Sequence, residues 1–231
     1  MAMEVGLDTG PVLLEGRLAI GLLETAGSLS ERLSALTASL LVEALPLIAA
    51  AGPGDQAERW HRLGVRPQTE AGLTYARLLS KDDLLLDWSD SGLTLHRRVM
   101  GLHPNAFCHW KGRRFKVLAS EPLVRRLRDQ LSPEAALLAD RWGLPAPDAG
   151  AGSDAQAGVA RSVGAPGEVL AIEPGLGVVV ATGGCPLLIR EGQLEGKAAV
   201  AGQALLQQLD ATPGQSFSGG PDLQPVVLGS T

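Results

Sequence analysis

The sequence predicts an α+β fold, with a long apolar helix near the start and a small antiparallel barrel in the second half. Leucines recur at helical spacing from residue 29 to residue 41, and five segments of strand length follow residue 105. Glycine and proline mark the boundaries between these segments, a pattern that favours a small barrel. The 231 residues suffice for one large domain or two small ones.

The first 51 residues are expected to contain an extended segment followed by a helix. Residues 10–20 read as extended, and Ser28 is expected to cap a helix that runs to about Leu47, with Glu31 reaching back. A strand and one helix with so apolar a face cannot close a domain alone. We therefore expect further chain upstream of this segment.

The rest of the chain is expected to form a linker and a second unit. Residues 52–79 are rich in turn signals and predict a linker. A helix is expected over residues 91–101, followed by the strands "AFCHW" and "RRFKVLA", which Lys111 and Gly112 join in a tight hairpin. The strands "GEVLAIE", "GVVVATG" and "PLLIRE" come later. An insertion at 121–162 carries helical patterns at 121–131 and 133–142, a last helix is expected near 200–209, and residues 211–231 are expected to be disordered.

Composition narrows the classes of function. No uninterrupted apolar run reaches the roughly 18 to 20 residues that span a bilayer, so we expect a cytoplasmic protein without membrane contact. Cys108 and Cys185 lie far apart and are expected to be buried free thiols. The histidines form no metal-ligand pattern, and we expect no bound metal.

Positive charge is concentrated between residues 93 and 128 although the net charge is −5. Arg114 and Lys116 alternate, which places both on one face of a strand, and Lys111 and Arg113 extend the same patch. Such a patch can bind phosphate. Trp110 beside it can stack on a base or lie under the barrel, and burial is favoured.

The triplet Asp8-Thr9-Gly10 has two interpretations. An aspartic protease needs two such carboxylates, each in a strand-rich domain, whereas here a long helix follows. His103 before Pro104 is another candidate catalytic group, but a turn role is favoured. The second interpretation of the triplet depends on the sequence stretches that follow it along the chain.

Several separated stretches resemble the methionyl-tRNA formyltransferase family. They are "GLDTGPVLL", "GSLSERLSAL", "LTYARLLSKDDLLLDWS", "HWKGRRFKV", "PGEVL" and "QLEGKAAV". The resemblance implies a remnant of a Rossmann-like formyltransferase domain at 1–51, followed by a small OB-like β-barrel domain at 80–210. It also implies transfer of a formyl group from 10-formyltetrahydrofolate to the amino group of initiator Met-tRNA.

The resemblance also implies roles for particular residues. Asp8 matches the catalytic aspartate, and Leu7, Asp8 and Thr9 match the formyl-donor site. The residues expected to contact tRNA are Arg97, Arg98, Lys111, Arg113, Arg114, Lys116 and Lys197.

The family's Asn-x-His-Pro-Ser stretch, which supplies two further catalytic groups, does not occur here. We therefore expect an N-terminally truncated chain that is inactive alone. The alternatives are a formyltransferase that acts on another amine, such as a nucleotide sugar, and a non-catalytic RNA-binding module.

Overall fold

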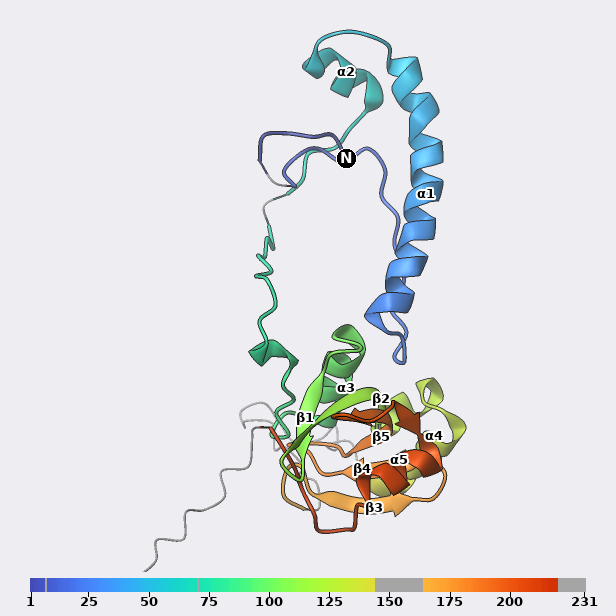
Figure 1. Cartoon of the computed structure of the whole chain (residues 1–231). Coiled ribbons are helices and arrows are strands. Elements are labelled where there is room, and N and C mark those ends of the chain that lie inside the picture. The colour runs from blue at the N-terminus through green and yellow to red at the C-terminus, as the bar shows by residue number, and fades with distance from the viewer. Residues whose placement is uncertain (7, 70, 144–163, 220–231) are drawn as a thin grey trace, which may run out of the picture. The chain divides into compact units, whose positions relative to one another are not determined.

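The computed structural model describes residues 1–6, 8–69, 71–143 and 164–219 (Figure 1). These residues form two compact units, each described by itself below. The first comprises residues 1–20 and 27–78, and the second comprises residues 21–26 and those from 79 onward.

The first unit is built on two helices. The long helix α1, Ala26–Ala51, begins two residues before Ser28 and continues past Leu47. Ser28 is thus inside the helix, and the prediction that it caps the helix is wrong. Helix α2, Gln56–Leu63, was not expected in a linker. The Asp55 side chain caps it by accepting from the Glu58 amide at 2.8 Å, and Gly64 ends it in the left-handed conformation.

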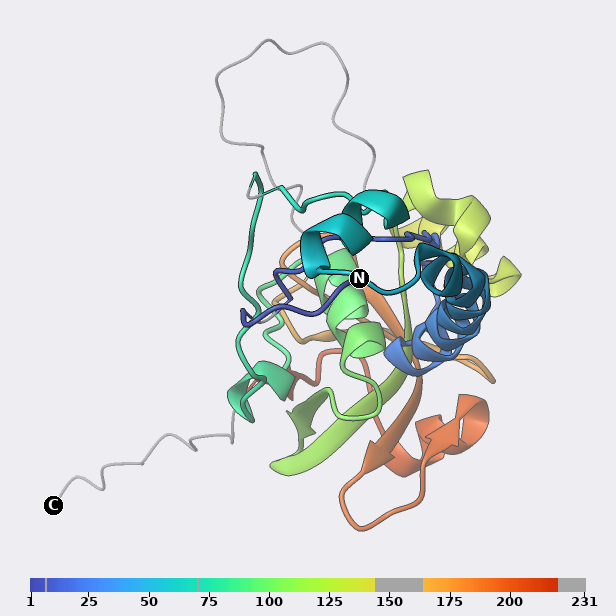
Figure 2. The ribbon, with the colours of Figure 1, turned by 90° about the horizontal axis from the view of Figure 1, so that it is seen from above.

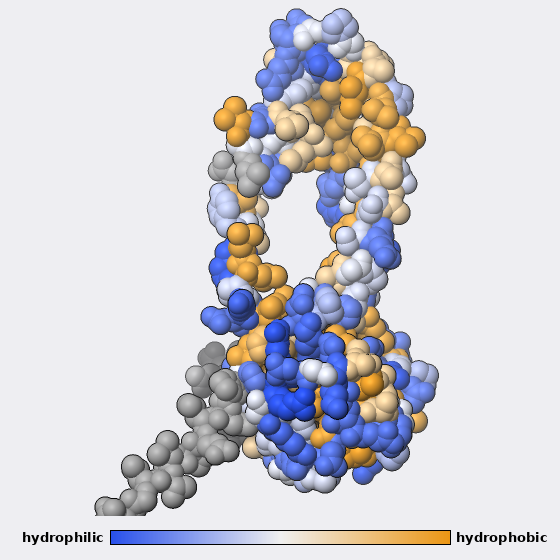
Figure 3. All heavy atoms as spheres, in the orientation of Figure 1, coloured by the Kyte–Doolittle hydropathy of each residue, from blue (hydrophilic) through white to orange (hydrophobic). Residues whose placement is uncertain are grey.

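Few side chains of α1 are covered. Among its residues only Ala51 is buried, and large apolar side chains such as Leu41, Val42 and Leu45 are more than half exposed. Figure 3 shows hydrophobic residues gathered around the upper half of this helix, on the side of α2. A helix of this kind needs apolar partners beyond those that its own unit supplies.

By length and composition alone, α1 could cross a membrane, since an 18-residue window in it has a mean hydropathy of 1.8. Serines, one threonine and three charged residues interrupt the apolar residues of this helix, so the sequence contains no uninterrupted apolar run of that length here. One such helix is weak evidence, because an apolar helix that packs inside a soluble protein passes the same test.

The second unit is a curled antiparallel sheet with helices around it. Its strands are β1 Phe107–Trp110, β2 Arg113–Pro122, β3 Val169–Glu173, β4 Gly177–Val180, β5 Leu187–Leu194, β6 Val200–Ala201 and β7 Phe217–Ser218. The order across the sheet is β3-β4-β5-β2-β1-β7, with β6 beside β5. All five expected strands are present, and the α+β class agrees with this architecture.

Further hydrogen bonds join the two edges of the sheet. The amide of Val169 donates to the carbonyl of Gln215 at 2.7 Å, and Phe217 donates to Gly167 at 2.9 Å. Strand β7 therefore belongs to the fold, although residues 211–231 were expected to be disordered. Its Phe217 packs against three aromatic rings of the core, Trp88, Trp110 and Phe115, which explains why this short segment is ordered.

Helices cover the sheet. Helix α3, Gly92–Gly101, is capped by Ser91 and lies over β2 and β5 (Figure 2). The short helix η1, Asp82–Leu84, precedes it. Helix α5, Gly202–Leu209, packs on β5, and α4, Pro133–Trp142, covers a second apolar cluster with Val179 and Leu188.

The insertion differs in part from the expectation. Glu121 belongs to β2, not to a helix, because its backbone pairs with Leu188 of β5. A 3-10 helix, η2 Arg125–Gln130, follows, and α4 has the expected bounds. Residues 144–162 of the expected insertion and 220–231 of the expected tail lie outside the described residues.

Candidate functional site

The Asp-Thr-Gly turn lies in the first unit. Asp8 has a φ of 55°, and its carboxylate is exposed. The side-chain amide of Gln68 donates to the carbonyls of Asp8 and Gly10, each at 2.7 Å. Thr9 donates to the Gly6 carbonyl at 3.2 Å. The turn is thus held from outside by Gln68, a residue that the sequence analysis did not single out, while Leu7 lies outside the described residues.

A single β-bridge anchors the chain after this turn. The Val12 amide donates to Arg66 at 2.8 Å, and the Arg66 amide donates back at 2.9 Å. Glu15 beside it accepts from Arg17 at 2.8 Å, and this hydrogen bond, with the charges of Arg17 and then Arg66, lowers the pKa of the Glu15 carboxyl. The turn that contains Asp8 is therefore held by the Val12–Arg66 bridge and by the side chain of Gln68.

The described residues of the first unit line a small hollow and a larger one. One of about 390 Å³ adjoins the turn and is lined by Thr9, Trp60 and His61 among others. The other, of about 600 Å³, lies between α1 and α2, with Leu40, Ile48 and Trp60 among its walls. The larger of these two hollows is lined mostly by apolar residues.

Four basic residues of the second unit lie on the hairpin of β1 and β2, namely Lys111, Arg113, Arg114 and Lys116. The register pairs His109 with Arg114 and Phe107 with Lys116. Cys108, Trp110 and Phe115 of the same two strands are buried. The side chains of Phe107, His109, Arg114 and Lys116 therefore share the outer surface of these strands, which we call the hairpin face.

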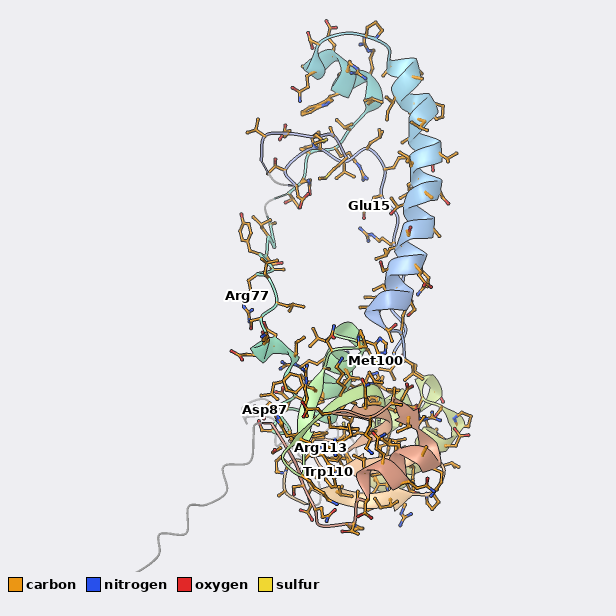
Figure 4. All side chains as sticks on the ribbon, viewed as in Figure 1. Glu15, Arg77, Asp87, Met100, Trp110 and Arg113 are labelled. Atoms are coloured by element: carbon orange, nitrogen blue, oxygen red, sulfur yellow. The ribbon has the colours of Figure 1, made fainter. Side chains whose placement is uncertain are left out.

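The turn of the hairpin has the expected form. Lys111 and Gly112 both have positive φ, at 49° and 72°, and Trp110 pairs with Arg113 across them (Figure 4). This geometry matches a two-residue primed turn. Both cations beside it are tethered, since Lys111 donates to the Asp210 carbonyl at 2.8 Å and Arg113 donates to the Glu195 carbonyl. Their charges stay at the hairpin end.

Arg97 and Arg98 occupy different environments on α3. Arg98 donates to the carbonyls of Asp83 at 2.6 Å and Leu85 at 3.2 Å, and lies 3.7 Å from Asp90. Its guanidinium thus holds the segment before α3. Arg97 is exposed and makes no such tether among the described residues, although both arginines line the same shallow hollow of about 530 Å³. The structure therefore separates these two predicted contacts into a structural arginine and an available one.

Lys197 follows β5 in an exposed turn. Its amide donates to Leu194 at 2.9 Å, and its carbonyl accepts from the Gln193 side chain at 2.9 Å. Gln193 pairs with Lys116 across β2 and β5. The backbone of Lys197 thus holds the turn, and its side chain is exposed.

Trp110 and the two cysteines differ in how deeply their side chains are buried. Trp110 is 1% exposed and donates to the Leu209 carbonyl at 2.8 Å, so burial is correct for it and it cannot stack on a base. Cys108 is buried and Cys185 half-buried, and burial raises the pKa of both thiols. Within the described part of the chain, no cluster of His, Cys, Asp or Glu could hold a metal ion.

Comparisons with known proteins agree on one family. The family model described as "Formyl transferase, C-terminal domain" matches residues 78–210. The methionyl-tRNA formyltransferase of Synechococcus sp. (strain WH7803) is 57% identical over 217 residues, which is 94% of this chain and 58% of that protein. The methionyl-tRNA formyltransferase of Prochlorococcus marinus (strain MIT 9313) is 52% identical over 222 residues, which is 95% of this chain and 60% of that protein. The chain spans about three fifths of the length of these relatives.

Proposed function

Because the chain belongs to the formyltransferase C-terminal-domain family, we propose that it serves the transfer of a formyl group from 10-formyltetrahydrofolate to the amino group of initiator Met-tRNA, in the cytoplasm. One observation carries this proposal. The relatives that align with 94–95% of this chain at 52–57% identity are named methionyl-tRNA formyltransferase.

Three segments of the chain have separate roles in this proposal. Residues 1–51 are the last part of a Rossmann-like catalytic domain, 52–79 link it to the rest, and 80–210 form an OB-like domain that holds the tRNA. The nearly bare apolar surface of α1 supports the first assignment, because a helix inside a complete domain would be covered. The curled sheet with positive charge on one hairpin supports the last.

Formyl transfer sets a chemical requirement at Asp8. Attack of an amine on the formyl carbon creates negative charge on the formyl oxygen, which must meet hydrogen-bond donors. An ionised carboxylate only accepts, so Asp8 can orient a donor or move a proton but cannot stabilise that oxygen. We assign Asp8 this role, with Leu7 and Thr9 beside it on the formyl donor.

The donors themselves are missing from this chain. In the family an Asn and a His from one stretch supply them, whereas here Asn105 is the only asparagine and lies near the start of β1. Removing one such donor costs about 10² to 10³ in rate. We therefore propose that this chain alone does not catalyse formylation.

The tRNA side of the proposal rests on cations that remain available. Arg97, Arg114 and Lys197 are exposed, and Lys116 lies half-buried on the hairpin face. Lys111 and Arg113 keep their charge at the hairpin end while tethered to backbone carbonyls. Contacts of this kind with phosphates give binding that weakens as salt rises. Arg98 takes part by positioning the segment around α3.

The test measures both activities in one preparation. The purified chain is assayed for formylation of Met-tRNA with 10-formyltetrahydrofolate, with the Synechococcus sp. (strain WH7803) relative as the positive control. Its tRNA affinity is measured from about 50 to 200 mM salt. Salt-dependent tRNA binding without formylation is expected. Robust formylation would overturn the account of the missing donors, and absence of tRNA binding would overturn the role of the second unit.

A further inference from the structure

An arginine and two rings are in contact on the hairpin face. The Arg114 guanidinium carbon lies 4.0 Å from the centroid of the Phe107 ring. Phe107 in turn meets the His109 ring edge-on, with centroids 5.7 Å apart and planes at 84°. The strand register explains this contact, because Phe107 and Arg114 are diagonal neighbours across β1 and β2.

This arrangement keeps the charge of Arg114 unneutralised. An aromatic ring attracts a guanidinium through its quadrupole without cancelling its charge. Glu195 follows β5 beside Arg114, and its amide donates to the Arg114 carbonyl at 2.9 Å. In the described part of the chain, however, the only carboxylate ion pair of a hairpin cation involves Lys111, and none involves Arg114. Arg114 is exposed, whereas Phe107 and His109 are half-buried. The ring thus supports a cation whose other side is open to solvent.

We propose that Arg114, supported by Phe107, is a stacking platform for an unpaired nucleobase of the bound tRNA. The proposal rests on the tRNA-binding role proposed above and adds a contact other than phosphate. A guanidinium stacks on planar groups and an ammonium does not, and bases offer a planar face whatever their sequence. Lys116, opposite Phe107 in the register, lies within the same face to meet the adjoining phosphate.

The decisive variant is Arg114→Lys, which keeps the charge and removes the plane. Phe107→Leu is the second variant, since it keeps an apolar side chain and removes the ring. The chain offers a matched control on α4, where the Arg141 guanidinium lies 5.2 Å from the Trp142 ring centroid. Arg141→Lys and Trp142→Leu repeat the same two changes away from the hairpin face. Thermal unfolding confirms that each variant is folded.

The measurement is the affinity for a bacterial initiator tRNA and for a fully paired RNA duplex, each across a salt series. Stacking of one base contributes about 5- to 150-fold in affinity, so both hairpin variants should weaken tRNA binding by at least about 5-fold. Duplex binding and the salt dependence of Arg114→Lys should match the wild type, because no charge is lost. Neither α4 variant should change tRNA binding.

Three results would each count against a particular statement. If wild-type chain binds tRNA and Arg114→Lys binds it equally well, the stacking platform is wrong while the tRNA-binding role stands. Equal losses for tRNA and duplex would also overturn it, since a paired duplex exposes no base to stack within its length. If the wild-type chain binds no tRNA, the proposed function fails and the platform fails with it.

Discussion

The imidazole Nε2 of His96 lies 2.7 Å from the carbonyl oxygen of Leu22, a residue 74 positions earlier in the chain. The carbonyl can only accept, so Nε2 carries the proton, and Nδ1 accepts from the Ser120 hydroxyl at 3.1 Å. His96 is fully buried. One neutral histidine of α3 thus fastens residues 21–26 to the second unit.

This histidine should make the stability of the second unit depend on pH. Burial lowers the pKa of His96 below its ordinary 6.5, and the charge of Arg97 adds to this effect. The hydrogen bond to the Leu22 carbonyl and the charge of Glu121 oppose it. The unfolded chain therefore takes up the proton first, so stability is full above about pH 6.5 and is lost as pH falls toward the lower, folded pKa.

The variant His96→Gln can keep both hydrogen bonds but cannot titrate. Its urea midpoint should change less between pH 7.5 and pH 5 than that of the wild type. The two proteins are compared in the same buffers across that interval. Parallel curves would show that His96 does not carry the pH dependence.

Glu121 is a buried carboxylate of the second unit with several hydrogen-bond donors around it. It is 2% exposed and accepts from the amide and hydroxyl of Ser132, each at 2.7 Å, and from Arg190. Glu121→Gln removes the charge that these donors share and should lower the free energy of unfolding by about 2 to 4 kcal/mol. Denaturant unfolding measures this. Glu195→Gln, in an exposed turn, is the control and should change it by under about 0.5 kcal/mol.

The hairpin turn supports a prediction about glycine. A Cβ added at Gly112 meets nothing within 4 Å, so only its φ of 72° opposes a side chain. Gly112→Ala should therefore cost about 1 to 2 kcal/mol of stability. Gly101, at the end of α3, is equally open but does not have a positive φ. Gly101→Ala should be neutral or stabilising by up to about 1 kcal/mol, and equal losses for both variants would contradict this account.

The neighbouring arginines of α3 should separate stability from binding. Arg98→Ala removes hydrogen bonds to two carbonyls and should lower the free energy of unfolding by about 1 to 3 kcal/mol. Arg97→Ala should change the free energy of unfolding by less than about 0.5 kcal/mol. It should, however, reduce the slope of log tRNA affinity against log salt concentration by about 1. Thermal unfolding and the salt series are measured on both variants. If Arg97→Ala lowers the free energy of unfolding and Arg98→Ala does not, the structural role belongs to Arg97.

Backbone hydrogen exchange should differ between the two units. Helix α1 has one buried residue, whereas β5 is central in the sheet and largely buried. Amides of α1 should therefore exchange faster than those of β2 and β5, because local opening of α1 breaks few apolar contacts. Equal protection would mean that α1 is covered in solution, for example by association of chains.

Local patterns predicted much of this fold. Strand lengths, the Lys111-Gly112 turn and the bounds of α4 follow from side-chain alternation and turn chemistry, which act over a few residues. The start of α1 was predicted wrongly because Ser28 is of a type that often caps helices, whereas the helix begins two residues earlier, at Ala26. Strand β7 was missed because two residues have no periodicity, and Phe217 is ordered by rings from elsewhere in the chain.

The sequence by itself determined the family, the alternation of β1 and β2 and the concentration of positive charge between residues 93 and 128. Only the tertiary structure decided which cations are available. Arg97 and Arg98 are adjacent and identical in type, yet carbonyls of a separate segment hold Arg98. Likewise Trp110 is buried in the core, whereas Phe107 lies on the hairpin face, where its ring contacts the Arg114 guanidinium. The physical reason is that hydrogen-bond partners and burial depend on residues distant in sequence, which no local pattern contains.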